Sequence, residues 1–195
     1  MLYYCNWVLG NSVATGASKQ ILVNVIGQAP MGFGVVILWR LVKKFGKRYV
    51  TVIGFSIAAL GSLMVLLAGS NTTYVLIGLF IKSIGTLPTY TMTAYLAEAL
   101  DHVEQTNKFR VDGFSASTNS IVQTVSMGLS QTILLAGING LGYISPETAV
   151  QVVEQTDCVV NFFRLSFAGV PTIGYILCAV IICFYRLKIN NRTTE

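Results

Sequence analysis

The sequence predicts an all-α membrane protein, a six-helix bundle whose first helix is a short stub, and three observations support this prediction. Only 11% of the 195 residues are charged, against about 25% in ordinary soluble domains. Long uncharged apolar segments alternate with short polar or basic loops. Basic residues gather beside these segments, as the positive-inside rule describes. We therefore expect residues 1–195 to form one transmembrane helical domain with the lipid bilayer as its partner. We expect no nucleic-acid partner, because the net charge of +5 is not concentrated in a basic stripe with interleaved aromatic residues.

Apolar segments of spanning length occupy approximately residues 21–42, 49–69, 74–100, 113–140 and 162–185, after a partial span at 1–10. The partial span covers only about half of a bilayer core. We interpret it as the tail of a helix whose beginning is missing, so that the chain is a fragment or the product of a truncated gene. Its Tyr4 and Trp7 suit either an interfacial aromatic belt or a face that stacks on a ligand ring.

The span at 21–42 follows a predicted polar loop at 11–20 and carries Asn24 and Gln28 one helical turn apart. Polar groups are costly in lipid, so this face should point at protein or water. The basic turn RLVKKFGKR that follows is typical of a cytoplasmic loop. The span at 49–69 has no charged residue inside its apolar part and suits a lipid-facing helix.

The span at 74–100 carries Lys82, Thr86, Thr89 and Thr93 at a spacing that places them on one helix face. Pro88, with a nearby glycine, is expected to weaken its backbone. Lys82 has two interpretations. It faces a central cavity, or it extends its stem toward the outer interface.

A charged loop at 101–112 leads into the span at 113–140, which carries a polar stripe that includes Asn119, Gln123 and Ser126. The last span at 162–185 is followed by basic residues, so positive-inside alternation predicts a cytoplasmic C-terminus. Two helices with polar faces and one nearly apolar helix occur twice in succession. This order predicts two inverted three-helix repeats.

The sequence contains no Ser/His/Asp constellation, phosphate-binding loop or metal-ligand spacing. We therefore expect no enzyme, no metal site and no bound cofactor. His102 is the sole histidine and lies in the charged loop, where a solvated or ion-paired role is expected.

The segment YLAEALDHVEQTNKFR at 95–110 resembles the glycoside–pentoside–hexuronide:cation symporters, the melibiose-carrier-like branch of the major facilitator superfamily. Its Asp101, Glu104 and Arg110 follow the D-x-x-E-x-x-x-x-x-R element of that family's loop between helices ten and eleven. RLVKKFGKR resembles the family's loop between helices eight and nine, GINGLGYISP the turn after helix eleven, and FYRL the end of helix twelve. Characterised members tend to carry a lysine midway along helix eleven, where Thr124 stands in this chain.

The resemblance implies the C-terminal half of a cation-coupled secondary transporter, which works by alternating access and requires an N-terminal six-helix half. It implies a multi-pass protein of the inner or plasma membrane, a small-molecule solute with a sugar as the leading guess, and Na⁺ or H⁺ as the coupling cation of the full-length carrier. Two alternatives remain open. One is a half-carrier remnant or membrane interaction module that does not transport, and the other is a homodimer of half-size subunits.

Two groups of residues follow from the polar faces and the resemblance. The predicted substrate cavity comprises Tyr4, Trp7, Asn24, Gln28, Lys82, Thr86, Thr89, Tyr90, Asn119, Gln123, Thr124 and Ser126. The predicted cytoplasmic ionic latch comprises Lys43, Lys44, Lys47, Arg48, Glu98, Asp101, Glu104, Arg110 and Asp112.

Overall fold

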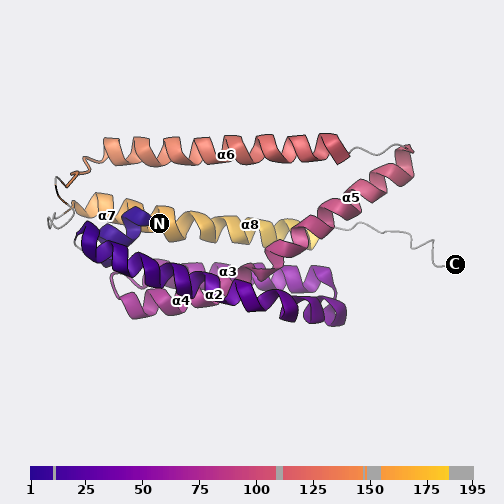
Figure 1. The fold of residues 1–195 in the computed structure, drawn as a ribbon, viewed down its shortest axis with the longest axis horizontal. Coiled ribbons are helices and arrows are strands. Elements are labelled where there is room, and N and C mark those ends of the chain that lie inside the picture. Colours follow the sequence, from indigo (N-terminus) through magenta and orange to yellow (C-terminus); the bar gives the residue numbers. More distant parts are fainter. Residues whose placement is uncertain (11, 109–111, 147, 149–154, 185–195) are drawn as a thin grey trace.

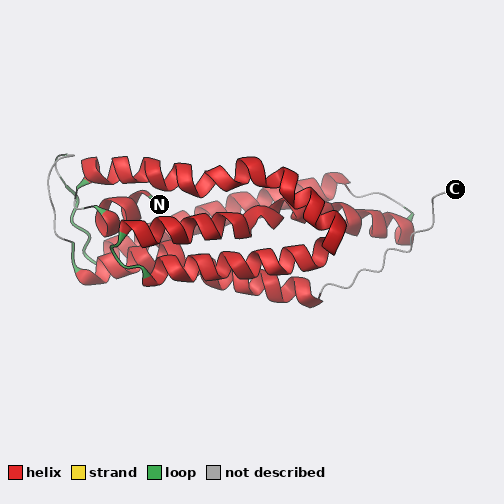
Figure 2. Cartoon of the chain, turned by 90° about the horizontal axis from the view of Figure 1, so that it is seen from below, coloured by secondary structure: helices red, strands yellow, loops and turns green. Residues whose placement is uncertain are grey.

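The computed structural model describes residues 1–10, 12–108, 112–146, 148 and 155–184. Within these residues the regular elements are all helical (Figures 1 and 2). They are α1 (Leu2–Tyr4) with a π-helical turn (Cys5–Leu9), α2 (Val13–Phe45), α3 (Lys47–Leu67), α4 (Thr72–Thr86) with a 3₁₀ turn (Leu87–Tyr90), α5 (Thr91–Asn107), α6 (Asp112–Gly140), α7 (Asp157–Arg164) with a π-helical turn (Leu165–Gly169), and α8 (Val170–Phe184).

Five helical stretches in the described part of the chain are long and apolar enough to cross a membrane. They are Val13–Phe45, Lys47–Leu67, Thr72–Thr106, Asp112–Gly140 and Asp157–Phe184. The chain is therefore a multi-pass membrane protein, and the predicted all-α membrane fold is confirmed. The inverted relation between its two halves stays a prediction.

The first long helix begins earlier than expected, at Val13 rather than near residue 21. Ser12 and Thr15 form a reciprocal cap: the Thr15 backbone N–H donates to Ser12 Oγ at 3.3 Å, and the Ser12 N–H donates to Thr15 Oγ1 at 3.2 Å. This arrangement satisfies two backbone donors that a helix start otherwise leaves without a partner. Most of the expected loop at 11–20 is consequently helix.

The span expected at 74–100 is broken into α4, a 3₁₀ turn and α5, which confirms the predicted weakening at Pro88. Thr91 stabilises the break, because its hydroxyl donates to the Pro88 carbonyl at 2.6 Å and shares a 2.9 Å hydrogen bond with the Thr51 hydroxyl. Beyond the break, α5 leaves the bundle obliquely (Figure 1). The end of the span at residue 100 thus lies inside a helix that continues to Asn107.

Helices α3 and α4 approach each other closely because glycines form their contact. An ideal Cβ on Gly61 would lie 2.4 Å from the backbone nitrogen of Lys82, and one on Gly85 would lie 2.2 Å from that of Ala58. Small residues permit such approach in membranes, where helix association depends on packing rather than on the hydrophobic effect. This contact sets the position of Lys82 relative to the rest of the bundle.

Helix α8 lies between the α2–α4 layer and α6 in the view of Figure 1. An aromatic cluster joins the elements at one end of the bundle, where Tyr3 stacks on Phe163 with ring centroids 5.2 Å apart. Helix α6 contributes Leu134 and Ile138 to the apolar core there. Along most of its length, the side chains of α6 are exposed. The predicted span end at residue 185 lies outside the described residues.

Candidate functional site

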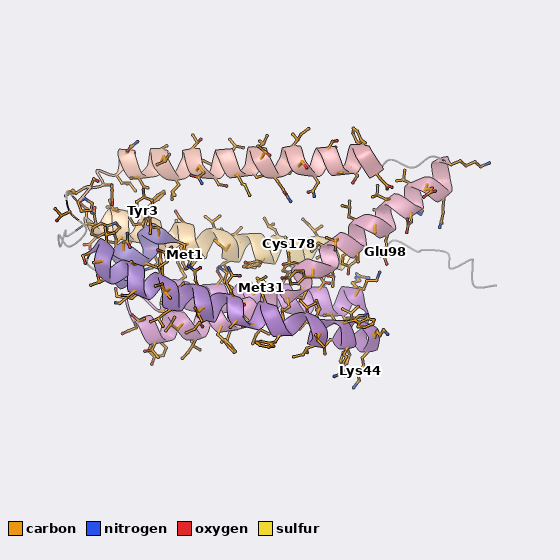
Figure 3. All side chains as sticks on the ribbon, viewed as in Figure 1. Met1, Tyr3, Met31, Lys44, Glu98 and Cys178 are labelled. Atoms are coloured by element: carbon orange, nitrogen blue, oxygen red, sulfur yellow. The ribbon has the colours of Figure 1, made fainter. Side chains whose placement is uncertain are left out.

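A cavity of about 360 Å³ lies between α2, α4 and α8. Its polar lining residues are Asn24, Gln28, Lys82, Ser83, Thr86 and Thr89, and its aromatic lining residues are Phe167 and Tyr175. Met1, at the N-terminus, and Met31 of α2 also line it, and both are labelled in Figure 3. Five of the twelve residues predicted for the substrate cavity therefore meet at one site: Asn24, Gln28, Lys82, Thr86 and Thr89.

Helical periodicity explains why these polar groups converge. Asn24 and Gln28 stand one turn apart on α2, and Lys82 and Thr86 stand one turn apart on α4, so each pair lies on one face. The 3₁₀ turn after α4 brings Thr89 to the same cavity. Asn24, Gln28 and Thr89 are exposed, so the cavity is open along this side.

Lys82 carries the one charged side chain among the described residues that line this cavity. Its Nζ lies 5.4 Å from the ring centroid of Phe167 and 5.8 Å from that of Tyr175. These distances fall within the range of cation–π attraction. Lys82 also lines a neighbouring cavity of about 500 Å³ that includes Tyr4 and Ser130. The ammonium group thus lies between the helices, over two aromatic faces.

Among the polar and aromatic lining residues, sequence reasoning missed three: Ser83, Phe167 and Tyr175. Ser83 is only 4% exposed, and its hydroxyl has no hydrogen-bond partner within the described part of the chain. A buried hydroxyl without a partner is uncommon in folded proteins. Ser83 stands three residues before Thr86, on the polar helix face already identified. This spacing is the signal in the sequence that could have found Ser83. Phe167 lies in a π-helical turn, which no feature of the sequence predicts.

The two aromatic residues predicted from the stub lie in the core rather than at the open cavity. Tyr4 is 1% exposed, and its ring stacks on that of Phe167 with centroids 4.3 Å apart. Trp7 is buried, and its indole N–H donates to the hydroxyl of Tyr143 at 3.1 Å. Burial raises the pKa of the Tyr143 phenol, although this hydrogen bond acts in the opposite direction. Trp7 therefore has a packing role in this structure, while Tyr4 supports Phe167.

The remaining predicted cavity residues are not brought to this cavity. Tyr90 is half-exposed. Asn119, Gln123, Thr124 and Ser126 are exposed on α6, and the Thr124 hydroxyl donates to the Ser120 carbonyl of its own helix at 2.9 Å. A contribution of this stripe to a cavity wall stays a prediction.

The predicted latch residues that the structure describes lie on α2, α3, α5 and the start of α6. Lys47 forms an ion pair with Glu98 and thereby joins α3 to α5, while Arg48 donates to the carbonyl of Cys183 on α8.

Lys44 and Glu98 lie toward the same end of the molecule (Figure 3). Lys43 and Lys44 lie over aromatic rings, and Asp101 is exposed. Glu104 lies on α5, Asp112 begins α6, and Arg110 lies outside the described residues.

A polar cavity between membrane helices suits a solute carrier, and comparison with known proteins supports that class. Residues 1–189 match the family described as MFS/sugar transport protein, so the chain belongs to that family. This membership places the chain in a family of transporters rather than enzymes and confirms the expected resemblance. The isoprimeverose transporter of Lactiplantibacillus pentosus is 26% identical over 157 residues, which cover 78% of this chain. The chain spans 31% of that relative's length. No solved structure matches the chain.

Proposed function

We propose that the chain forms one of the two helical bundles of a secondary transporter for a small saccharide such as isoprimeverose. The observation that carries this proposal is the convergence of polar side chains from α2, α4 and the 3₁₀ turn on one cavity within a membrane domain. Polar groups inside a membrane are costly and commonly mark a solute pathway. The family of the chain and the name of its relative support a sugar as the solute.

The lining residues provide the chemistry that a saccharide needs. The amides of Asn24 and Gln28 both donate and accept hydrogen bonds, as do the hydroxyls of Thr86 and Ser83, and so does every sugar hydroxyl. The Ser83 hydroxyl, which has no partner among the described residues, gains one from a bound sugar. The apolar face of the sugar ring packs against Phe167. The cavity volume of about 360 Å³ falls within the usual range for small-molecule sites.

A second bundle covers the open side of this cavity. Asn24, Gln28 and Thr89 are exposed there, and leaving them in hydrocarbon is unfavourable. A facing bundle with water between the two removes that cost and supplies the missing wall. The two bundles then expose the site alternately to either side of the membrane by rocking about it. The coupling cation, Na⁺ or H⁺, binds with the participation of the second bundle.

The basic turn between α2 and α3 lies on the cytoplasmic side in this proposal, as does the C-terminus. The ion pair between Lys47 and Glu98 belongs to the predicted latch on that face. A partly exposed pair is worth only about 0–1 kcal/mol. Formed in one access state alone, it biases the balance between states by that amount.

The decisive experiment measures uptake of radiolabelled isoprimeverose and a panel of other saccharides. Cells express either this chain alone or this chain together with the N-terminal six-helix half of the isoprimeverose transporter. We expect saturable uptake from the pair only. Gln28→Leu and Thr86→Val should abolish it at unchanged membrane levels. Ser56→Ala, whose hydroxyl bonds its own helix at Val52, is the matched control and should retain it.

Three results contradict the proposal in different ways. Uptake by the chain alone supports a homodimer of half-size subunits. Uptake by the pair that is insensitive to Gln28→Leu and Thr86→Val places the sugar elsewhere. A pair that inserts and associates but transports none of the saccharides supports a membrane interaction module.

A further inference from the structure

An apolar groove of about 490 Å³ lies on the other side of the α2–α4 layer. Its walls include Phe33, Ile37 and Leu41 of α2, Ile57 of α3 and Ile84 of α4. Every lining side chain of this groove is a hydrocarbon or aromatic group, apart from one glycine on each of α2 and α3. Its chemistry is therefore opposite to that of the saccharide cavity.

This apolar groove and the polar cavity of about 360 Å³ lie on different faces of α2 and α4. At about 100° per residue, Ile37 and Leu41 point well away from Gln28 around the axis of α2. On α4, likewise, Ile84 lines the apolar groove and Lys82 lines the polar cavity. In the proposed function a second bundle covers the polar face, and on that basis the apolar groove faces the lipid. Phe33 is 82% exposed and Ile37 is 59% exposed along it.

The groove runs to the basic end of the bundle. On α2 its lining begins at Pro30 and ends at Phe45, a length of roughly 22 Å at 1.5 Å per residue. This exceeds the roughly 15 Å of hydrocarbon in one leaflet. The exposed ammonium of Lys44 lies 5.4 Å from the ring centroid of Phe45, at the mouth of the groove.

We propose that this groove binds one acyl chain of an anionic phospholipid whose phosphate is held by Lys44. The hydrocarbon walls accept the chain, and the ammonium at the mouth lies at the depth of the headgroup. Basic residues between membrane helices on the cytoplasmic side are suited to anionic headgroups. The nearby Lys47 does not hold the phosphate in the same way, because its ammonium group is paired with the Glu98 carboxylate.

A second apolar groove provides an internal control for this proposal. It has a volume of about 590 Å³ and lies between α3 and α8, with Ile176 and Val180 in its wall. Arg48, the basic residue that reaches α8, donates to the backbone carbonyl of Cys183. Since that guanidinium already has an acceptor, this groove should take acyl chains with little preference for headgroup charge.

The test is native mass spectrometry of the purified full chain with phosphatidylglycerol and phosphatidylcholine of identical acyl chains. We expect one phosphatidylglycerol to bind about fivefold more tightly than phosphatidylcholine. This ratio corresponds to the roughly 1 kcal/mol by which one lysine attracts an anionic membrane surface. Lys44→Gln should remove that preference. Lys43→Gln should retain it, because Lys43 lies over Trp39, which is outside the groove. Ile37→Trp should remove the preferential binding of phosphatidylglycerol by filling the groove, whereas Ile176→Trp should leave that preference unchanged.

A second measurement is independent of purification. Phosphatidylglycerol with a photoactivatable group in its acyl chain is crosslinked to the chain in intact membranes, and the modified residues are mapped. Labelling concentrated on α2, α3 and α4 around Ile57 supports the proposal. Equal binding of the two lipids, equal effects of Lys44→Gln and Lys43→Gln, or labelling spread evenly over all exposed helices would overturn it.

Discussion

Replacing Gly61 by alanine should destabilise the protein by separating α3 from α4. The added Cβ would lie 2.4 Å from the Lys82 backbone nitrogen and 2.8 Å from the Gly78 carbonyl oxygen. Ordinary contacts of this kind begin near 3.5 Å, so the two helices must move apart by about 1 Å. The atoms that the methyl group meets belong to backbone, which cannot rotate away as a flexible side chain can.

The expected magnitude combines two opposing effects. Overpacking a well-packed contact costs roughly 1–3 kcal/mol. Replacing glycine by alanine at a compatible helical position stabilises the folded state by about 0.4–1 kcal/mol, because the unfolded chain loses conformational entropy. We therefore expect the free energy of unfolding to fall by roughly 1–2 kcal/mol. Because the displaced atoms belong to Lys82, saccharide affinity in the completed carrier should fall as well.

The assay is reversible unfolding in mixed micelles of mild detergent and SDS, followed by circular dichroism. Gly128→Ala on α6 is the matched control, since its added Cβ meets no atom within 4 Å. That variant should be as stable as the parent or slightly more stable. If Gly61→Ala behaves like Gly128→Ala, α3 and α4 do not pack as closely as the structure shows.

Three further predictions concern the site and its surroundings. In the completed carrier, Lys82→Met should abolish or uncouple saccharide uptake without preventing membrane insertion, and Lys82→Arg should restore binding only in part. Normal uptake by Lys82→Met with unchanged pH and ion dependence would instead indicate that the lysine reaches the outer interface. Glu98→Lys should shift the balance between inward-facing and outward-facing states, measured by cysteine accessibility, and adding Lys47→Glu should partly reverse the shift. Identical accessibility in the parent, single and double variants would show that this ion pair is only a surface feature. A cysteine at Gln123, in a chain lacking native cysteines, should react with a membrane-impermeant thiol reagent, whereas one at Leu129 should not. The reverse pattern would contradict a water-facing stripe on α6.

Much of the fold was predictable because hydropathy and helical periodicity are local properties of the sequence. The low charge content and the long apolar segments predicted the all-α membrane domain. The spacing of Asn24 with Gln28, and of Lys82 with Thr86, predicted polar faces that the structure brings to one cavity. The break at Pro88 was also predictable, since proline cannot donate the backbone hydrogen bond that a continuous helix requires.

Other features depend on residues far apart in the chain, and only the tertiary structure decided them. Trp7 meets Tyr143 because the N-terminal segment packs against the segment that follows α6, which no local pattern encodes. Phe167 lies under Lys82 because glycine contacts between α3 and α4 and a π-helical turn before α8 set the positions of both groups. The sequence by itself thus determined which helix faces are polar. Packing at small residues determined which of those faces meet, because the distance between two membrane helices depends on the side chains of both.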